Sequence, residues 1–386
     1  MLSYLAQSCQ ISLRGTRVEL FDIASARQPP FFRASPMNFT SDNAAGVAPA
    51  ILDAVVRANS GFAIAYGNDE WTRAVERRLC EIFEREVAVF LVPTGTAANA
   101  LAIAHLSPPW GAVLCHADAH IATDEAGAPE FFGGGLKLVG LPGEGGKLAP
   151  STVEAALGRG RGAPHAALPA VLSLTQATEA GTVYRIEEVR ALAALAHAHG
   201  LAVHMDGARF ANALVSLRCT PAEATWKAGV DVLSFGATKA GALAAEAVIF
   251  FDAARANGMA SRRKRGGHLV SKHRFLAAQF DAYLKDDLWL DLARRANAAA
   301  ADLARRLTAL GLRPFWPVEA NEVFVALPPA VDDRLKAAGA QYYPWPREAL
   351  PASAAVPPDH RPVRLVTSFA TTAEDVERFV ALACAG

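Results

Sequence analysis

Two side chains with complementary chemistry follow two predicted strands: the carboxylate of Asp206 and the amine of Lys239. The apolar run 201–203 indicates a buried strand that ends near Asp206, and the run 231–235 indicates a second strand. A turn of small residues then leads to Lys239. Because open α/β sheets bind ligands at the carboxyl ends of parallel strands, we expect this acid and this amine to face one cleft.

An acid and an amine placed in this way suit pyridoxal phosphate. Lysine binds the aldehyde of this cofactor, and a carboxylate keeps its ring nitrogen protonated, so that the ring accepts electrons from a bond that breaks at the substrate Cα. Either residue alone is usually an ordinary charged side chain at a strand end. The pair, in this order and each after a strand, favours the cofactor interpretation.

A predicted helix start upstream of both residues offers a site for the cofactor phosphate. The apolar run 87–92 predicts a strand, and the turn 93–96 leads into a helix expected over 97–106. Gly95 lets the backbone approach an anion, and the Thr96 hydroxyl and the N–H groups of the helix start can donate to it. The motif is weak alone and gains weight from Asp206 and Lys239.

Two runs of sequence resemble the signatures of the L-threonine aldolase family: HMDGARFANA at 204–213 and LSFGATKAGALAAEAVIFF at 233–251. The resemblance extends from about Asn38 to the C-terminus. It implies a fold-type-I pyridoxal-phosphate enzyme of the α/β class, in the aspartate-aminotransferase fold group. Members often carry glycine or asparagine after the lysine; Ala240 stands there in this chain, and the amine does not depend on it.

The chain is also long enough for two domains, since its 386 residues exceed the usual size of a single core. By resemblance we expect a large domain over 37–285, with a mostly parallel sheet between helices, and a smaller α/β domain over 286–386. The N-terminal segment of the large domain should reach the small one. Residues 1–36 are interpreted as a start placed too early, with Met37 as the natural beginning, or as an extension that packs on the surface or a partner subunit.

His120 matches the family histidine that stacks on the cofactor ring. Its nitrogen is a candidate for handling a proton, directly or through a water that it orients, because an unperturbed imidazole titrates near neutrality. The alternate spacing of His116, Asp118 and His120 also allows a metal site. The resemblance favours the cofactor role, so no metal is expected.

The resemblance implies that Arg209, Arg364 and Ser41 bind the substrate carboxylate, since a guanidinium fork matches a carboxylate. Arg209 is expected beside the cofactor as well. The structural alternative for Arg209 is an ion pair within its own helix. The alternative for Ser41 is a cap on the helix predicted over 49–58.

Three further segments have open roles. Tyr66 lies in a Tyr-Gly-Asn-Asp segment that resembles the family loop reaching a neighbouring subunit's active site, and its alternative is a simple turn. Gln176 or Glu179, in a polar loop, could touch the cofactor or substrate. The basic run 261–268 is interpreted as a solvated loop or as an arm that crosses a subunit interface to a phosphate.

The implied reaction is retro-aldol cleavage of L-threonine, L-allo-threonine or a related β-hydroxy-α-amino acid such as phenylserine. The products are glycine and an aldehyde, so the protein would be a carbon–carbon lyase of amino-acid metabolism. An aminotransferase, or a β-eliminating lyase such as a cysteine lyase or desulfurase, is the alternative within this fold. A non-catalytic regulator that binds pyridoxal phosphate is less favoured, because no DNA-binding segment is appended.

Composition narrows the possible partners. Lys and Arg total 38, as do Asp and Glu, so the formal net charge of zero argues against nucleic-acid or polybasic membrane binding. The five cysteines are scattered without metal or disulfide spacing, and no apolar run has spanning length. We expect a cytoplasmic enzyme with a small amino-acid substrate. By resemblance it forms a homodimer or homotetramer with active sites at the subunit interface.

Overall fold

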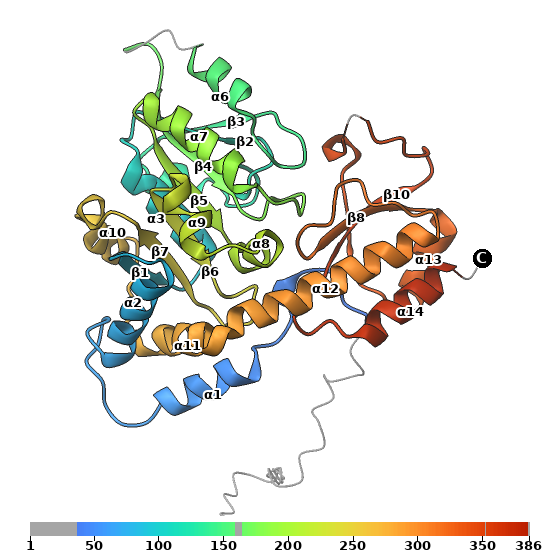
Figure 1. The fold of residues 1–386 in the computed structure, drawn as a ribbon, viewed down its shortest axis with the longest axis horizontal. Helices are drawn as coiled ribbons and strands as arrows, with labels where there is room; N and C mark the ends of the chain where they lie inside the picture. Colours follow the sequence, from blue (N-terminus) through green and yellow to red (C-terminus); the bar gives the residue numbers. More distant parts are fainter. Residues whose placement is uncertain (1–36, 159–163, 352, 385–386) are drawn as a thin grey trace, which may run out of the picture. The chain divides into compact units, whose positions relative to one another are not determined.

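The computed structural model describes residues 37–158, 164–351 and 353–384 (Figure 1). Within them lies a seven-stranded sheet of order β1-β7-β6-β5-β4-β2-β3, and a three-stranded sheet of order β8-β10-β9. Strands β2 to β6 pair in parallel, whereas β7 is antiparallel to both β6 and β1. The predicted α/β class with a mostly parallel sheet is therefore confirmed. The expected extension, 1–36, lies outside the described residues.

The strands are β1 Ala88–Val92, β2 Gly111–His116, β3 Lys137–Leu141, β4 Leu168–Thr175, β5 Ala202–Gly207, β6 Val232–Gly236, β7 Glu246–Phe250, β8 Glu322–Leu327, β9 Tyr343–Pro344 and β10 Arg361–Val366. The α-helices are α1 Pro49–Ala58, α2 Glu70–Ile82, α3 Gly95–Leu106, α4 His120–Thr123, α5 Ala128–Phe132, α6 Pro150–Leu157, α7 Ile186–Ala198, α8 Phe210–Leu217, α9 Pro221–Ala224, α10 Met259–Arg265, α11 Arg274–Leu284, α12 Leu288–Ala309, α13 Pro329–Ala337 and α14 Ala373–Cys384. Short 3₁₀ helices are η2 Asp42–Ala44, η3 Trp226–Ala228, η4 Ala253–Ala256, η5 Lys285–Asp287 and η6 Arg347–Ala349.

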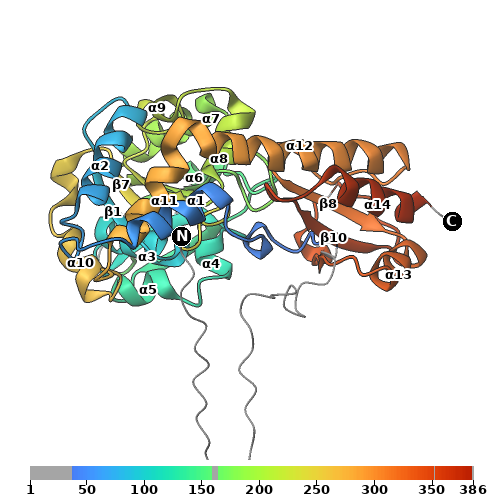
Figure 2. The same ribbon diagram turned by 90° about the horizontal axis from the view of Figure 1, so that it is seen from below.

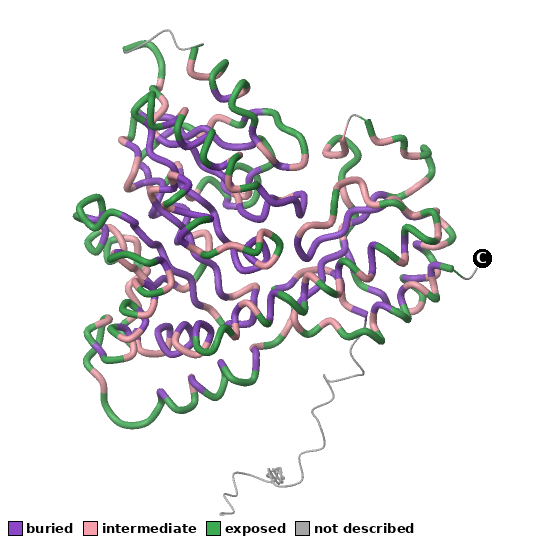
Figure 3. Tube along the Cα trace, in the orientation of Figure 1, coloured by how far each residue is buried: buried purple, intermediate pink, exposed green. Residues whose placement is uncertain are grey.

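The central strands β5, β6 and β7 are buried along their whole length (Figure 3). Side chains alternate between the two faces of a strand, so each face needs its own cover. On β6, Val232 belongs to the apolar cluster that includes α3, whereas Leu233 and Phe235 belong to the cluster that includes α7, α8 and α11. Helices on both faces explain why these strands are nearly continuous apolar runs.

The three-stranded sheet is tied to the beginning of the described chain. The backbone N–H of Phe39 donates to Gln341 (2.8 Å), and that of Val366 donates to Phe39 (2.9 Å). Met37 and Phe39 are buried in the same apolar cluster as β8 and β10. Helix α12 contacts α8 and α11 at one end and β8 and α14 at the other (Figure 2). The domain boundary between residues 285 and 286 stays a prediction.

The basic run differs from its prediction as a loop. Its residues up to Arg265 belong to helix α10, which no Pro or Gly interrupts. Arg263 donates to the Leu91 carbonyl (3.1 Å) and lies over the Phe90 ring (5.5 Å), so part of the run packs against β1. Separately, none of the helices described here combines the length and apolarity needed to cross a membrane.

Phe235 occupies the centre of the large aromatic cluster and is fully buried. Rings with centroids within 6.3 Å of its own belong to Phe83, Phe210, Phe280, Tyr283 and Trp289. We expect Phe235→Ala to lower the free energy of unfolding by about 3–5 kcal/mol, because it leaves a cavity that these rings cannot fill. Urea unfolding of the cofactor-free protein measures it. Trp110→Ala, at a position 74% exposed, is the control, and an equally small effect of both changes would contradict the packing described.

Candidate active site

A cavity of about 590 Å³ lies at the carboxyl ends of β4, β5 and β6. Its lining brings together these residues predicted for the site: Gly95, Thr96, His120, Asp206, Arg209 and Lys239. The acid and the amine at neighbouring strand ends therefore share one cavity. Their chemical roles stay predictions at this point.

Asp206 is held near the end of β5, where it pairs in register with Thr175 of β4 and Ser234 of β6. It is only 4% exposed. Asn99 of α3 donates to its Oδ2 (2.7 Å), and the backbone N–H of Ala208 donates to its Oδ1 (2.9 Å). A buried carboxylate needs such donors, because burial without them costs several kcal/mol. Asp206 is thus fixed in position as an acceptor facing the cavity.

Lys239 is half-buried just beyond β6, on a turn closed by the backbone N–H of Gly241, which donates to Thr238. The same turn is tied to the start of β7, since Ala245 N–H donates to the Thr238 hydroxyl (3.2 Å). Glu246, the first residue of β7, is buried in the cavity wall and accepts the N–H of Ala237 (3.3 Å). The antiparallel strand β7 thereby places a second carboxyl close to the amine.

Helix α3 begins at the cavity wall. The Thr94 hydroxyl accepts the N–H of Ala97 (3.1 Å) as an N-cap, which leaves the N–H groups of Gly95 and Thr96 at the open end of the helix. A Cβ added to Gly95 would meet nothing within 4 Å, so the approach to this end is clear. These are the features of a phosphate site at a helix N-terminus.

His120 is linked to Asp206 through a chain of hydrogen bonds. Its Nδ1 lies 2.9 Å from Oε1 of Glu125, whose side chain is fully buried. The bond from Glu125 raises the pKa of His120 above its usual value, against the opposing effect of burial. Asn99 donates to the same Glu125 oxygen (2.8 Å) as well as to Asp206. The imidazole is therefore oriented by a buried acid.

Arg209 precedes α8 and is not paired within that helix, so the alternative of an intrahelical ion pair is wrong. Its Nε and Nη2 donate to both oxygens of Asp42 (2.8 and 3.2 Å), and its Nη1 lies 3.4 Å from Glu322. Burial would raise the pKa of Asp42, but Arg209 and Lys239 outweigh burial and lower it. Burial raises the pKa of Glu322, which Arg209 only partly offsets.

Ser41, Tyr66 and Arg364 are not among the residues lining the cavity. The Ser41 hydroxyl accepts the N–H of Asn43 and caps η2, so the suggested cap on α1 is wrong. The ring of Tyr66 lies under the Lys264 amine (4.7 Å). Arg364 lies over Trp345 (5.7 Å). Substrate or subunit contacts of these three residues stay predictions.

The prediction did not assign Asn99, Glu125 or Glu246 to the site. Glu246 lies in the run 233–251, from which only Lys239 was assigned to the site. Asn99 lies on the helix whose first residues were expected to bind the phosphate. Glu179, whose role was left open, lines the cavity, and burial raises its pKa to about 7. Gln176 instead bonds the backbone of Tyr184 at both ends of its amide.

These residues fit pyridoxal phosphate. Asp206 supplies a fixed acceptor for a ring N–H, Lys239 an amine for the aldehyde, and the start of α3 a set of donors for the phosphate. In the described part of the chain, no group of three His, Cys, Asp or Glu side chains is arranged to hold a metal ion.

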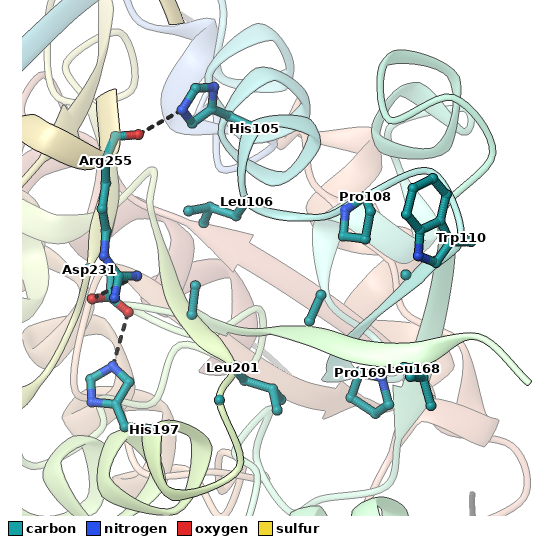
Figure 4. A pocket seen from close by; sticks show the side chains of 14 residues that line it. His105, Leu106, Pro108, Trp110, Leu168, Pro169, His197, Leu201, Asp231 and Arg255 are labelled. Carbon is teal, nitrogen blue, oxygen red and sulfur yellow. Dashed lines mark hydrogen bonds and ion pairs between the residues drawn. The ribbon is translucent and has the colours of Figure 1, made fainter. Parts of the chain in front are cut away.

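A depression of about 660 Å³ lies at the opposite edge of the sheet and is shown in Figure 4. Its charged groups are engaged with one another: Asp231 lies 3.0 Å from Nε2 of His197 and 3.3 Å from Arg255, whose carbonyl is 2.7 Å from Nε2 of His105. These contacts join α3, α7, η4 and the residue before β6 at the amino ends of the strands. Neither Lys239 nor Asp206 is among the described residues that line this depression.

Comparison with known proteins shows the family to which the chain belongs. The family model described as beta-eliminating lyase matches residues 38–329. Low specificity L-threonine aldolase from Pseudomonas aeruginosa is 45% identical over 306 residues, which cover 79% of this chain and 88% of that protein. The solved structure of threonine aldolase from Leishmania major has a TM-score of 0.83 at 32% identity and covers 90% of this chain and 98% of that one.

A more distant structure shares the fold alone. Serine palmitoyltransferase from Sphingomonas wittichii has a TM-score of 0.66 at 17% identity and covers 90% of this chain and 86% of that one. The chain belongs to the beta-eliminating lyase family and, as its sequence predicted, to the threonine aldolases within the fold-type-I enzymes that depend on pyridoxal phosphate.

Proposed function

We propose that the protein cleaves the Cα–Cβ bond of L-threonine, L-allo-threonine or a related β-hydroxy-α-amino acid, and releases glycine and an aldehyde. The carrying observation is that Lys239, Asp206 and the His120–Glu125 pair line or adjoin one cavity. The relatives named low specificity L-threonine aldolases support the same reaction, because their similarity covers most of both chains.

Three parts of the chain would hold the cofactor. Lys239 would bind its aldehyde, the start of α3 its phosphate, and Asp206 the proton on its ring nitrogen. When bound, pyridoxal phosphate supplies an electron sink for the pair left on Cα when a bond to that carbon breaks. Asn99 keeps the Asp206 carboxylate oriented, so that this proton stays in place throughout turnover.

Arg209 is the first candidate to bind the substrate carboxylate, with Arg364 and Ser41 as further candidates. Asp42 holds both ends of the Arg209 fork in the structure. An incoming carboxylate would therefore compete with Asp42 for these donors or share them. We therefore propose that the substrate carboxylate replaces Asp42, or joins it, at the Arg209 guanidinium.

His120, or a water that it orients, would take the proton of the β-hydroxyl. Glu125 accepts from Nδ1 or shares a proton with it, which leaves Nε2 for the substrate side. The raised pKa of His120 makes it a stronger base than a free imidazole. When the base takes the hydroxyl proton, the O–H pair forms the C=O bond of the aldehyde and the Cα–Cβ bond breaks, leaving its pair on Cα. A proton added at Cα then completes glycine.

Elimination at Cβ is the second candidate, favoured by the description of the family model. The two reactions are separated by their products. Cleavage of threonine between Cα and Cβ gives acetaldehyde and glycine, whereas β-elimination gives ammonia and a keto acid. Following both products from one incubation with L-threonine decides between them.

A cytoplasmic location and assembly into a homodimer or homotetramer are part of the proposal. Large apolar side chains are exposed on α1 and on the segment after it: Leu52, Val56, Phe62 and Ile64. Monomers rarely leave such a group uncovered, which supports a second copy on this face.

Lys239→Ala should abolish turnover and covalent attachment of the cofactor. The reason is that Lys239 is the only lysine among the described residues that line the cavity. After borohydride reduction of the loaded proteins, mass spectrometry should find the cofactor's mass on the wild type and none on the variant. Lys137→Ala, at an exposed position of β3, is the control. A Lys239→Ala protein with full activity would falsify the proposed role.

Glu246→Gln should change how stability depends on pH. Burial raises the pKa of Glu246 to about 7 in the folded protein, so the folded state holds this proton more tightly than the unfolded chain does. The stability from this group is complete below the unfolded pKa of about 4.3 and is lost as pH rises through about 7. Relative to wild type, the variant should gain up to about 4 kcal/mol of unfolding free energy as pH rises from about 4.3 to about 7.

The measurement is urea unfolding of the cofactor-free proteins at several pH values. Glu154→Gln, at an exposed position on α6, should follow the wild-type curve. If the unfolding free energy of Glu246→Gln also changes with pH in parallel with that of wild type, the pKa of Glu246 is not raised by burial as described.

A further inference from the structure

Glu322 is a buried carboxyl group beside the guanidinium that is proposed to bind the substrate carboxylate. It is the first residue of β8 and is 2% exposed. Its Oε2 lies 3.4 Å from Nη1 of Arg209, which is an ion contact but too long for a strong hydrogen bond. Neither of its carboxyl oxygens has a hydrogen-bond partner among the described residues. Only nearby cations therefore stabilise a charge on Glu322.

Asp42, the second carboxylate at this guanidinium, is held differently. Nε and Nη2 of Arg209 donate to its two oxygens, and Nδ2 of Asn321 donates to its Oδ2 (3.1 Å). Burial acts to raise the pKa of Asp42, but the charges of Arg209 and Lys239 outweigh burial and lower it. Asp42 is therefore the acid that stays ionised beside Arg209.

The charged groups that face Glu322 make its protonation depend on Arg209. Burial is the largest effect and raises the pKa of Glu322 above its usual value. Arg209 offsets burial more than any other group does, and Arg364 of β10 comes next. Asp42 adds to the rise, and Lys239 offsets it least. Any change in what Arg209 binds is therefore felt first at Glu322.

A substrate would bring a third carboxylate to the same guanidinium. The side chain of Arg209 is 11% exposed, so water screens the charges around it only weakly. Like charges that share a buried site raise the pKa of one of them, because both cannot stay ionised at low cost. Asp42 has direct donors and Glu322 has none, so the added proton belongs on Glu322.

We propose that Glu322 takes up one proton from solvent when a substrate carboxylate binds at Arg209. The carboxylate of Glu322 becomes a carboxylic acid, and no other bond in the protein changes. The charge that the substrate adds is thereby cancelled inside the site. This inference rests on the function proposed above, in which Arg209 binds the carboxylate. Glu322 acts through Arg209 and is a positioning residue for the substrate.

The proposal fixes the direction of the pH dependence. The pKa of Glu322 is higher in the complex than in the free protein, so the complex holds the proton more tightly. Affinity for the carboxylate is complete below the pKa of Glu322 in the free protein. It falls as pH rises from that value to the pKa in the complex, by up to about tenfold per pH unit, and is constant above it.

The test titrates 3-hydroxybutanoate into protein loaded with pyridoxal phosphate. This compound has the carboxylate and hydroxyl groups of threonine but no amine, so its binding involves no exchange at Lys239. Calorimetry in buffers of different ionisation enthalpy gives the number of protons taken up, at pH values from about 5 to about 9. Wild type should take up as much as about one proton per ligand within this range, and its Kd should rise with pH there.

Glu322→Gln keeps the shape of the side chain but cannot accept the proton. It should lack the uptake shown by wild type and should lose the rise of Kd with pH that goes with it. Glu377→Gln, at an exposed position on α14, is the matched control and should behave as wild type does. If Glu322→Gln does not fold, as judged by circular dichroism, Glu322→Leu takes its place, because apolar residues commonly replace buried charges without loss of stability.

Equal proton uptake by wild type and the folded Glu322 variant at every pH would overturn the proposal. Absence of uptake by wild type would overturn it without any variant. If neither 3-hydroxybutanoate nor glycine binds to the loaded protein, the carboxylate site is wrong and the proposal falls with it.

Failure of the proposed reaction gives a different result. If the loaded protein releases no aldehyde from L-threonine but binds 3-hydroxybutanoate with uptake that depends on Glu322, the reaction is wrong and this inference stands. If it releases aldehyde and shows no such uptake, the reaction stands and this inference is wrong.

Discussion

The buried carboxylate of Asp206 is the constraint on which the arrangement of the site depends. Its 4% exposure removes it from water, so its charge has to be stabilised by donors that the fold supplies. Asn99 and the Ala208 backbone supply two such donors. The bond from Asn99 requires α3 to lie across the sheet beside β5. The same helix then presents its N-terminus to the cavity, so one packing arrangement sets both the acid and the phosphate donors.

Carboxyl groups outnumber cationic groups among the residues that line the cavity around Lys239. This imbalance influences the pKa values of the buried carboxyl groups. Burial raises the pKa of Glu179 and of Glu246 to about 7, because neither has a cationic partner strong enough to offset desolvation. Asp42 behaves in the opposite way, since Arg209 holds it directly. The site therefore combines two acids whose pKa is raised, Glu179 and Glu246, with Asp42, whose pKa is lowered.

The sequence predicted correctly those features that depend on residues close together in the chain. The sheet, and the positions of Asp206 and Lys239 at strand ends, follow from short apolar runs and the residue after each. It failed where partners are distant along the chain: Arg209 and its partner Asp42 are 167 residues apart, and no periodicity links them.

The central claim is that Asp206 keeps a proton on the ring nitrogen of the cofactor. It is tested most directly by the ¹⁵N chemical shift of that nitrogen in protein loaded with ¹⁵N-labelled pyridoxal phosphate. The account predicts a protonated ring nitrogen in wild type across neutral pH, and a deprotonated one in Asp206→Asn, whose amide can donate to the nitrogen but cannot stabilise its charge. The same protonation state in both proteins would contradict it.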